Sequence, residues 1–257
     1  MTIDLYGNFA GFYDLDFVDR DDDLLFYEQF CARCGSPILE LGCGTGRLML
    51  PLVRQGFDVT GVDISPAMLE RAQRRLAVEG LPGRATLLEQ DMRHLALDGR
   101  FNLALLAVNS FMHMLTLDDQ LATLARIREH LNPGGVLLLD LFNPDLPRLL
   151  EPGGQMFLDR VTTHPETGHR VFKFRTQRVD LGLQTIHVTY MVDEVDGQGS
   201  VVRRTLIPFS VRYLFRGELE LLLRHAGFKI EAIYGSYDLD EFTGDSARML
   251  PVARRPG

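Results

Sequence analysis

Three glycines that alternate with other residues follow a short apolar stretch, and this pattern limits the folds open to the chain. The apolar stretch covers residues 37–41, and Gly42, Gly44 and Gly46 come directly after it. Glycine takes positive φ without steric cost and has no Cβ, so a ligand can lie against the main chain there. A helical pattern follows, and the start of a helix presents unpaired N–H groups to such a loop. The order strand, glycine loop, helix predicts a nucleotide site.

The spacing of these glycines distinguishes between nucleotide cofactors. It is G-x-G-x-G here, whereas the dinucleotide fingerprint is G-x-G-x-x-G. Glu40 stands two residues before the first glycine, and a carboxylate attracts a cation and repels a pyrophosphate. The pattern therefore disfavours an NAD-dependent oxidoreductase and favours S-adenosylmethionine, which is positively charged. Glu40, Cys43 and the three glycines are assigned to cofactor binding.

The composition narrows the class of partner. The chain has 257 residues, of which 46% are hydrophobic and 24% charged, enough for one domain or one domain with an insertion. The formal net charge of -8 opposes binding to nucleic acid or to an anionic membrane, which needs clustered positive charge. A leader peptide and a membrane-spanning run are not recognisable. We expect a cytoplasmic protein that acts on a small molecule, with a homodimer left open.

The three cysteines favour reduced thiols over a disulfide framework. Cys31 and Cys34 have C-x-x-C spacing, which could begin a zinc or redox site. However, a second pair does not follow, and positions i and i+3 of a helix share a face. We therefore expect both side chains to pack rather than to bind a metal.

The first 141 residues alternate between strand and helix patterns. We expect helices over residues 21–34, 47–55, 65–79 and 117–131, and strands over 38–41, 58–62, 85–89, 101–108 and 136–141, with residues 132–135 as a turn. The continuous apolar run at 101–108 is typical of a strand buried on both faces of a parallel sheet. Acidic residues at 21–23 suit a helix start, and Ser65 and Thr116 are expected helix caps. The fold class is α/β, a doubly wound sheet.

The pattern changes beyond Pro144. Residues 161–180, 184–194 and 200–214 alternate between apolar and polar side chains and predict antiparallel strands. A helix over 216–226 and short strands near 229–234 and 247–253 complete the chain. We therefore expect a main domain over 36–155 and 214–257, an antiparallel insertion over 156–213 that shapes the substrate pocket, and a helical segment over 1–35 that closes over the cofactor.

Acidic residues follow the second and third expected strands. Asp63 lies beside the glycine loop, where doubly wound folds place a carboxylate that accepts hydrogen bonds from ribose hydroxyls. The alternative, a helix cap, is already supplied by Ser65. Asp91 suits the adenine amino group and Met92 the adenine ring, although acidic residues are also common turn formers. The same cofactor site is assigned two further residues, Ile64 and Met68.

Together these motifs resemble class I S-adenosylmethionine-dependent methyltransferases. The resemblance rests on residues 40–47, Asp63, residues 91–92 and the Leu-Asn-Pro-Gly-Gly stretch at 131–135, and it spans roughly residues 38–141. It implies a seven-stranded sheet whose last strand is antiparallel. It also implies that the glycine loop holds the methionine and sugar portion of the cofactor, that Asp63 binds the ribose, and that Asp91 and Met92 contact the adenine.

The segment after the fourth strand resembles narrower groups. Residues 109–114, Asn-Ser-Phe-Met-His-Met, resemble a stretch of glycine N-methyltransferases. A similar polar-x-x-x-His pattern and a Tyr-Asp like residues 13–14 occur in nucleotide-amino-sugar N,N-dimethyltransferases. The resemblance implies methyl transfer to a small-molecule acceptor, at an amine nitrogen before a hydroxyl oxygen. A non-catalytic S-adenosylmethionine-binding module or sensor is the alternative.

Metal-dependent O-methylation is disfavoured by the same segment. Such an enzyme would need carboxylates after the fourth strand to hold the cation, and Asn109 and Ser110 stand there instead. We expect no metal.

Candidate catalytic residues come from this segment and from the N-terminus. His113 could accept the proton that an ammonium acceptor must lose, directly or through water, or it could simply hold the loop. Asn109 is expected to position the acceptor and to contact the cofactor. Tyr13, together with Tyr6, is expected to close over the cofactor, with ordinary aromatic packing as the alternative.

The insertion carries several arginines that could clamp a substrate carboxylate or phosphate. They are Arg170, Arg175, Arg203, Arg204 and Arg212. Arginine suits bidentate recognition of such groups, although alternating arginines on a strand more often form its solvated face. We assign Arg212 and Arg175 to substrate binding, with Arg212 preferred because it precedes the aromatic Tyr213.

Overall fold

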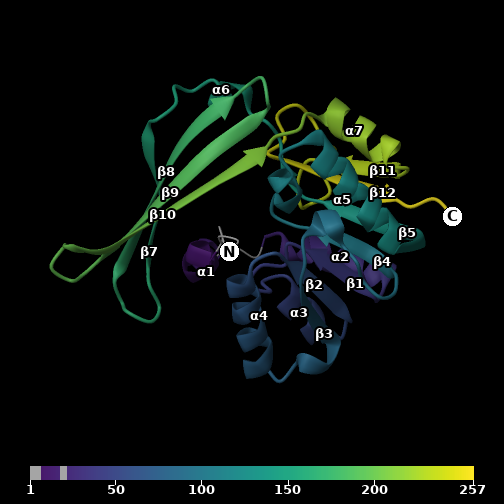
Figure 1. Cartoon of the computed structure of the whole chain (residues 1–257), viewed down its shortest axis with the longest axis horizontal. Coiled ribbons are helices and arrows are strands. Elements are labelled where there is room, and N and C mark those ends of the chain that lie inside the picture. Colours follow the sequence, from purple (N-terminus) through teal and green to yellow (C-terminus); the bar gives the residue numbers. More distant parts are fainter. Residues whose placement is uncertain (1–6, 18–21) are drawn as a thin grey trace.

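The computed structural model describes residues 7–17 and 22–257. Tyr6 and Asp21 lie outside these described residues. Figure 1 shows two parts side by side: a layered α/β body and a long antiparallel sheet that extends from it. Within the described residues, none of the helices is long and apolar enough to cross a membrane.

The central sheet has the strand order expected for the doubly wound class, β11-β12-β5-β4-β1-β2-β3. Its strands are β1 (Ile38–Leu41), β2 (Val59–Asp63), β3 (Ala85–Glu89), β4 (Phe101–Leu106), β5 (Leu131–Leu139), β11 (Lys229–Tyr234) and β12 (Arg248–Arg254). Strands β1 to β5 pair in parallel, whereas β12 is antiparallel to both β5 and β11. A short strand, β6 (Leu141–Phe142), also pairs with β12. The predicted fold class is confirmed, including the antiparallel last strand.

Helices cover both faces of this sheet because successive strand residues point to opposite sides. Ile38 of β1 belongs to the core cluster with α2 (Leu24–Cys34) and α3 (Met49–Arg54). The next residue, Leu39, belongs to the cluster with α5 (Leu117–His130) and α7 (Arg216–His225). All four residues of β1 are buried, as a strand at the centre of a three-layer fold requires.

Two helix starts follow from local side-chain chemistry, as the sequence predicts. The Ser65 hydroxyl accepts a hydrogen bond from the Met68 amide at 3.4 Å, and Pro66 opens α4 (Pro66–Val78). The Thr116 hydroxyl accepts the Asp119 amide at 3.1 Å at the start of α5. These caps determine where α4 and α5 begin, and so where the chain leaves the carboxyl edge of the parallel strands.

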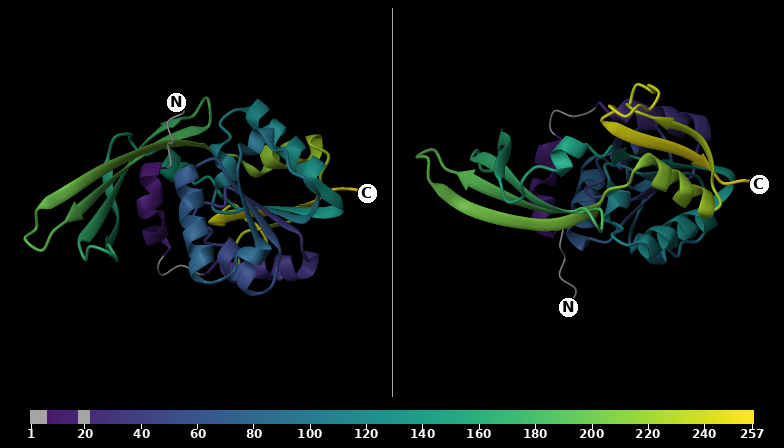
Figure 2. Two further views of the ribbon diagram at one scale, coloured as in Figure 1. Left: turned by 60° about the horizontal axis from the view of Figure 1, so that its bottom comes forward. Right: turned by 90° about the horizontal axis from the view of Figure 1, so that it is seen from above.

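The second sheet has four antiparallel strands in the order β10-β9-β8-β7. They are β7 (Met156–Thr163), β8 (Arg170–Asp180), β9 (Thr185–Val195) and β10 (Val201–Arg212). Helix α1 (Gly7–Tyr13) lies between this sheet and α4, as both views of Figure 2 show. Phe12 and Leu15 pack there against Val171 and Val192.

The structure corrects three boundaries expected from sequence. Residues 161–180 form two strands rather than one, because residues 164–169 turn the chain and Gly168 takes a φ of +70°. Residues 132–135 lie within β5, where a register shift against β4 absorbs them. Strand β4 ends at Leu106, because Val108 and Asn109 take positive φ.

Short elements that the sequence did not predict complete the described fold. They are α6 (Leu146–Leu149) and the 3-10 helices η1 (Asp14–Asp16), η2 (Pro82–Arg84), η3 (Met92–His94) and η4 (Ser110–His113).

Glu40 is a carboxyl group inside the core strand β1. It is 3% exposed, and its Oε2 has no hydrogen-bond partner among the described residues. Burial raises the pKa of Glu40 to about 8, since the charged form is poorly solvated there. The folded protein therefore holds a proton on Glu40 at pH values where the unfolded chain has released it.

We predict that this proton makes the ligand-free protein lose stability as the pH rises from about 4.5 to about 8. In this window the folded state binds more protons than the unfolded state, so the free energy of unfolding falls with increasing pH. Glu40→Gln should flatten the dependence, and Glu89→Gln, at the exposed end of β3, should not. Urea unfolding at a series of pH values measures it; an unchanged slope in Glu40→Gln would refute the prediction.

Candidate functional site

A cleft of about 1630 Å³ lies between the strand ends of the central sheet and the antiparallel sheet. It brings together residues that follow β1, β2, β3 and β4, as expected for the carboxyl edge of a doubly wound sheet. The predicted site residues that line it are Tyr13, Gly42, Gly44, Asp63, Ile64, Met68, Asp91, Met92, Asn109, His113 and Arg175. The predicted residues that do not line it are Glu40, Cys43, Gly46 and Arg212.

The glycine loop forms one wall of the cleft. Gly42 has a φ of +71°, and a Cβ there would stand 2.7 Å from the Ser110 hydroxyl oxygen. Gly44 has a φ of +54° and faces the cleft, where a Cβ would meet the Tyr13 ring only at 3.8 Å. Gly42 is thus required for close approach of the loop after β4, whereas Gly44 leaves bare main chain toward the cleft.

The other predicted loop residues lie behind this wall. The Cys43 side chain packs against Gly61 of β2, and Gly46 lies against Ala72 of α4. Burial raises the pKa of the Cys43 thiol well above its ordinary value, so it is an inert packing group. Cys31 and Cys34 are likewise free thiols, on α2.

Asp63 connects the glycine loop to the start of α4. Its two carboxylate oxygens accept hydrogen bonds from the Gly44 amide at 2.8 Å and from the Ser65 amide at 2.9 Å. The carboxylate therefore sets the shape of the loop and also lines the cleft.

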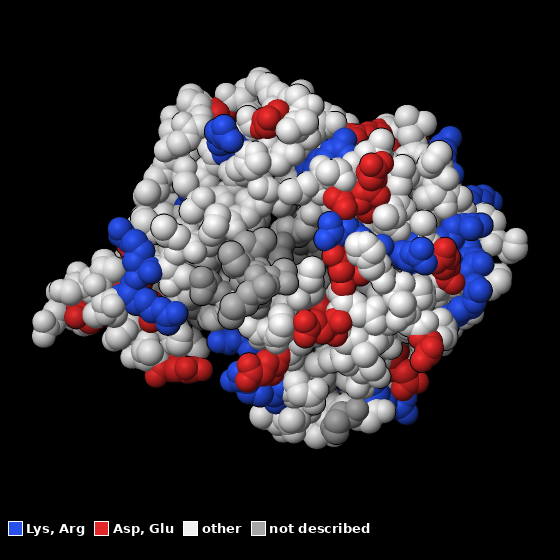
Figure 3. Space-filling model, viewed as in Figure 1, with Lys and Arg blue, Asp and Glu red and all other residues white. Residues whose placement is uncertain are grey.

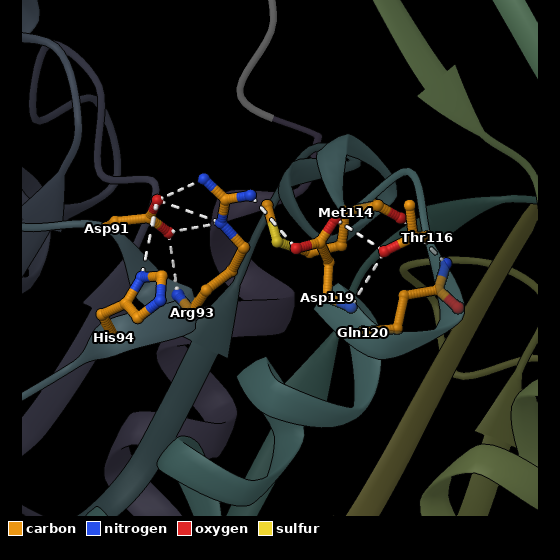
Figure 4. Close-up of polar contacts among 7 residues, drawn as sticks. All are labelled: Asp91, Arg93, His94, Met114, Thr116, Asp119 and Gln120. Carbon is orange, nitrogen blue, oxygen red and sulfur yellow. Dashed lines mark hydrogen bonds and ion pairs between the residues drawn. The ribbon is translucent and has the colours of Figure 1, made fainter.

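Asp91 follows β3 and is held by Arg93, two residues further along the chain, as Figure 4 shows. The Arg93 guanidinium donates to both Asp91 oxygens and also reaches Asp119 at 3.1 Å. The hydrogen bonds from Arg93 lower the pKa of Asp91, so it stays ionised. Met92 lines the cleft beside it.

The loop after β4 contributes Asn109, Ser110 and His113 to the cleft. Asn109 has a φ of +65°, a conformation that asparagine adopts more readily than most residues. Its side-chain oxygen accepts the Phe142 amide at 2.8 Å, so this oxygen holds the loop to β6. The NH2 group of Asn109 can still donate to a ligand.

His113, the predicted proton acceptor, and Tyr13, predicted to close over the cofactor, are both titratable groups that line the cleft. Burial lowers the pKa of His113 to about 4, and a hydrogen bond to the Ser210 backbone opposes this shift. Burial raises the pKa of the Tyr13 phenol well above its ordinary value. At neutral pH His113 is therefore an uncharged imidazole and Tyr13 a protonated phenol, which makes both weak proton acceptors.

The antiparallel sheet lines the cleft with a cation that the sequence did not single out. The Lys173 ammonium lies 2.5 Å from an Asp16 oxygen, 3.3 Å from an Asp159 oxygen and 3.8 Å from the centre of the Tyr190 ring. Burial lowers the pKa of Lys173, but Tyr190 and Asp16 outweigh it and keep the pKa above its ordinary value. The charge of Lys173 is therefore already compensated inside the cleft.

Arg175 lies on the same face of β8 as Lys173, two residues further along. Its Nη1 donates to the Gln177 side chain at 2.6 Å, and its buried Nε has no hydrogen-bond partner among the described residues. A period of two along 173, 175 and 177, all of which line the cleft, was the sequence signal that could have identified Lys173.

Arg212, the preferred substrate ligand from sequence, lies elsewhere. Its guanidinium donates to Glu218 at 2.7 Å and to Gln120 at 2.9 Å, and it does not line the cleft. The structure therefore places Arg212 in a contact between β10, α5 and α7, and of the two arginines assigned to substrate binding only Arg175 lines the cleft.

Ser110, next to Asn109, was not predicted to line the cleft. Its hydroxyl donates to the Ala107 carbonyl at 2.7 Å, and it lies directly against Gly42. In sequence it is an ordinary small residue, so its contact with the glycine loop is visible only in the fold.

Charge on the outer surface is mixed. Figure 3 shows Lys and Arg interspersed with Asp and Glu on the face it presents, rather than gathered into a region of one sign. Within residues 7–17 and 22–257, no group of three His, Cys, Asp or Glu side chains is arranged to hold a metal ion.

Comparisons with known proteins agree with this geometry. A family model described as a methyltransferase domain matches residues 38–135. The chain is 30% identical to the cypemycin N-terminal methyltransferase of a Streptomyces species, covering 86% of this chain and 84% of that protein. It is 32% identical to a glycine/sarcosine N-methyltransferase of Halorhodospira halochloris, covering 93% and 87% respectively.

A solved structure has the same fold over the full length. The CcbJ methyltransferase of Streptomyces caelestis superposes with a TM-score of 0.84 at 24% identity, covering 100% of both chains. One assignment follows from the glycine loop, the acidic residues at the ends of β2 and β3, the strand order and these relatives. The chain belongs to the class I S-adenosylmethionine-dependent methyltransferases.

Proposed function

We propose that this enzyme transfers a methyl group to the nitrogen of a small amine that also carries an anionic group. The observation that carries the proposal is the pairing of an uncharged His113 with Arg175, whose buried Nε lacks a partner among the described residues, in one cleft. The two relatives named above, an N-terminal and a glycine/sarcosine N-methyltransferase, support nitrogen as the acceptor atom. Arginine is suited to a carboxylate or phosphate on the same molecule.

The cofactor fits the wall made by the strand ends. Gly44 offers main chain without a side chain, and the Asp63 carboxylate lines the same wall, which suits a cationic ligand. In this proposal the glycine loop holds the methionine portion with Glu40 behind it, Asp63 binds the ribose, and Asp91 and Met92 contact the adenine. Ile64 and Met68 would add apolar contacts. S-adenosylmethionine supplies an electrophilic methyl group on a sulfonium.

The N-terminal segment and the antiparallel sheet close this site in the proposal. Asp14 accepts a hydrogen bond from the Thr45 hydroxyl of the glycine loop at 2.6 Å, and Asp16 binds Lys173 of β8. The segment around η1 is therefore tied to both walls of the cleft. Tyr13, on this segment, would cover the cofactor as a hydrogen-bonding wall rather than act as a base.

His113 acts in this proposal by accepting a hydrogen bond from the acceptor amine. Because the pKa of His113 is about 4, its neutral imidazole is too weak a base to take and keep a proton from an ammonium group. The amine instead loses its proton to water, and His113 and Arg175 hold the neutral amine in place. Positioning of this kind can supply roughly 7–11 kcal/mol of a methyl-transfer barrier.

A non-catalytic S-adenosylmethionine sensor is the second candidate, since it would keep the same cofactor wall. Release of S-adenosylhomocysteine from a panel of amino acids, small amines and nucleotide sugars separates the two. Cofactor binding with no release across this panel and a matching panel of hydroxyl acceptors would favour the sensor.

Asp63→Ala should abolish micromolar binding of S-adenosylmethionine. The variant loses two charge-assisted hydrogen bonds to ribose hydroxyls, and we expect affinity to fall at least about 100-fold. Asp58→Ala is the matched control, because Asp58 precedes the same strand and pairs with Arg84 on the surface. Calorimetry measures both affinities. Binding of normal strength in Asp63→Ala would disprove the ribose role.

His113→Ala should lower turnover about 10- to 100-fold, the effect of one lost hydrogen bond in a desolvated site, while the cofactor affinity stays unchanged. His94→Ala, at an exposed imidazole, is the control.

The pH profile of kcat/KM should follow the pKa of the acceptor amine and rise until the amine is neutral. His113, whose pKa is about 4, should cause no break in the profile between pH 5 and 8. A break near pH 6.5 that is independent of the acceptor and absent in His113→Gln would show ordinary general-base catalysis instead.

Arg175→Met should raise the KM of anionic acceptors about 10- to 100-fold and leave cofactor affinity unchanged, because one charge-assisted contact is lost. Arg178→Met, on the exposed part of the same strand, should change neither quantity. Steady-state kinetics with an acceptor and its amide or ester analogue measure the effect. An equal loss for the charged and uncharged analogues would rule out a role in anion recognition.

A further inference from the structure

Val108 and Asn109 form a strained turn at the wall of the cleft. Val108 has a φ of +48° and Asn109 one of +65°. A β-branched residue is a genuine outlier at positive φ, because its Cβ crowds the neighbouring carbonyl. Such a conformation persists only where the surroundings hold it, and it is often found at functional sites. Both residues line the cleft, and His113 follows within the same loop.

The group that holds this turn is Asp140, which does not line the cleft. It is fully buried in the break between β5 and β6. Its Oδ2 accepts the Val108 amide at 3.0 Å, and its backbone carbonyl accepts the Asn109 amide at 2.8 Å. Asp140 thus contacts both residues of the strained turn through hydrogen bonds, and it reaches the loop after β4 from the neighbouring strand.

The Asp140 carboxylate is itself fixed by three elements that are distant in sequence. Tyr27 of α2 donates to Oδ2 at 2.6 Å, and Tyr237 donates to the same oxygen at 3.0 Å. Arg248 of β12 forms an ion pair with Oδ1. These contacts hold the buried carboxylate in one orientation.

We propose that Asp140 is a positioning residue for methyl transfer, which holds the Val108–Asn109 turn in its strained conformation and so places His113 and Asn109 against the acceptor. It acts through the loop and does not touch the substrate. This role requires that the protein transfers methyl groups, as its family does, but not that the acceptor is an anionic amine. Hydrogen–deuterium exchange, the first measurement, does not depend on turnover.

The test compares Asp140→Asn, Val108→Gly and the double variant by hydrogen–deuterium exchange and by turnover with the best acceptor from the panel above. Asp140→Asn should speed exchange of the peptide covering 107–113 and lower kcat about tenfold or more. Asp193→Asn is the control, since it removes a buried carboxylate paired with Arg204, away from the cleft. It should leave exchange at 107–113 unchanged.

Rescue distinguishes positioning from general stability. Glycine takes positive φ without strain, so adding Val108→Gly to Asp140→Asn should restore part of the protection at 107–113 and part of the turnover. A double variant no better than Asp140→Asn would overturn the proposal, as would exchange at 107–113 that matches the control.

A second comparison keeps the proposal testable if Asp140→Asn does not fold. In the presence of Asp140, Val108→Gly should have a higher Tm than Val108→Ala, because only alanine retains a Cβ at positive φ. An equal or lower Tm for the glycine variant would show that the turn is not under strain and would refute the proposal.

Discussion

The hydrogen bonds accepted by Asp63 are the contacts on which the arrangement of the site depends. Asp63 ends β2, yet it receives the Gly44 amide from the loop after β1 and the Ser65 amide from the start of α4. Parallel pairing of β1 with β2, with Leu41 beside Val62, brings these ends together. Gly61 completes the arrangement, because a Cβ there would clash with Met49 and Cys43. One carboxylate therefore couples the packing of the sheet to the shape of the cofactor wall.

Several titratable groups of the cleft are either paired with an opposite charge or uncharged. Arg93 neutralises Asp91, and Asp16 with Asp159 surrounds the Lys173 ammonium. His113 is uncharged because desolvation by the surrounding protein lowers its pKa. Arg175, in contrast, keeps a buried Nε without a partner among the described residues. In the proposed function an anionic group of the acceptor binds Arg175, so specificity is expected to lie with the antiparallel sheet and catalytic alignment with the loop after β4.

The elements of the central sheet follow from local rules and could be read from sequence. The caps at Ser65 and Thr116 depend on neighbouring residues, and the strand at residues 85–89 is visible in the local pattern; all three were predicted correctly. Two predictions were wrong for different reasons. The single strand expected at 161–180 is a hairpin, because the local turn at residues 164–169 was missed. Residues 132–135 continue β5, because pairing with the distant strand β4 absorbs an irregular register.

The sequence also located most of the candidate site, because glycine spacing and acidic residues at strand ends are local signals that the doubly wound topology gathers at one edge. It preferred Arg212 to Arg175, since alternation along a strand does not say which face meets the cleft and which meets Glu218. Nor could it show that His113 is uncharged or that Asp140 holds Val108, because burial and contacts across 32 residues of chain exist only in the folded state. The sequence by itself determined the fold class and the cofactor; the tertiary structure decided which side chains share the cleft and in what protonation state, because both depend on the packing of distant segments.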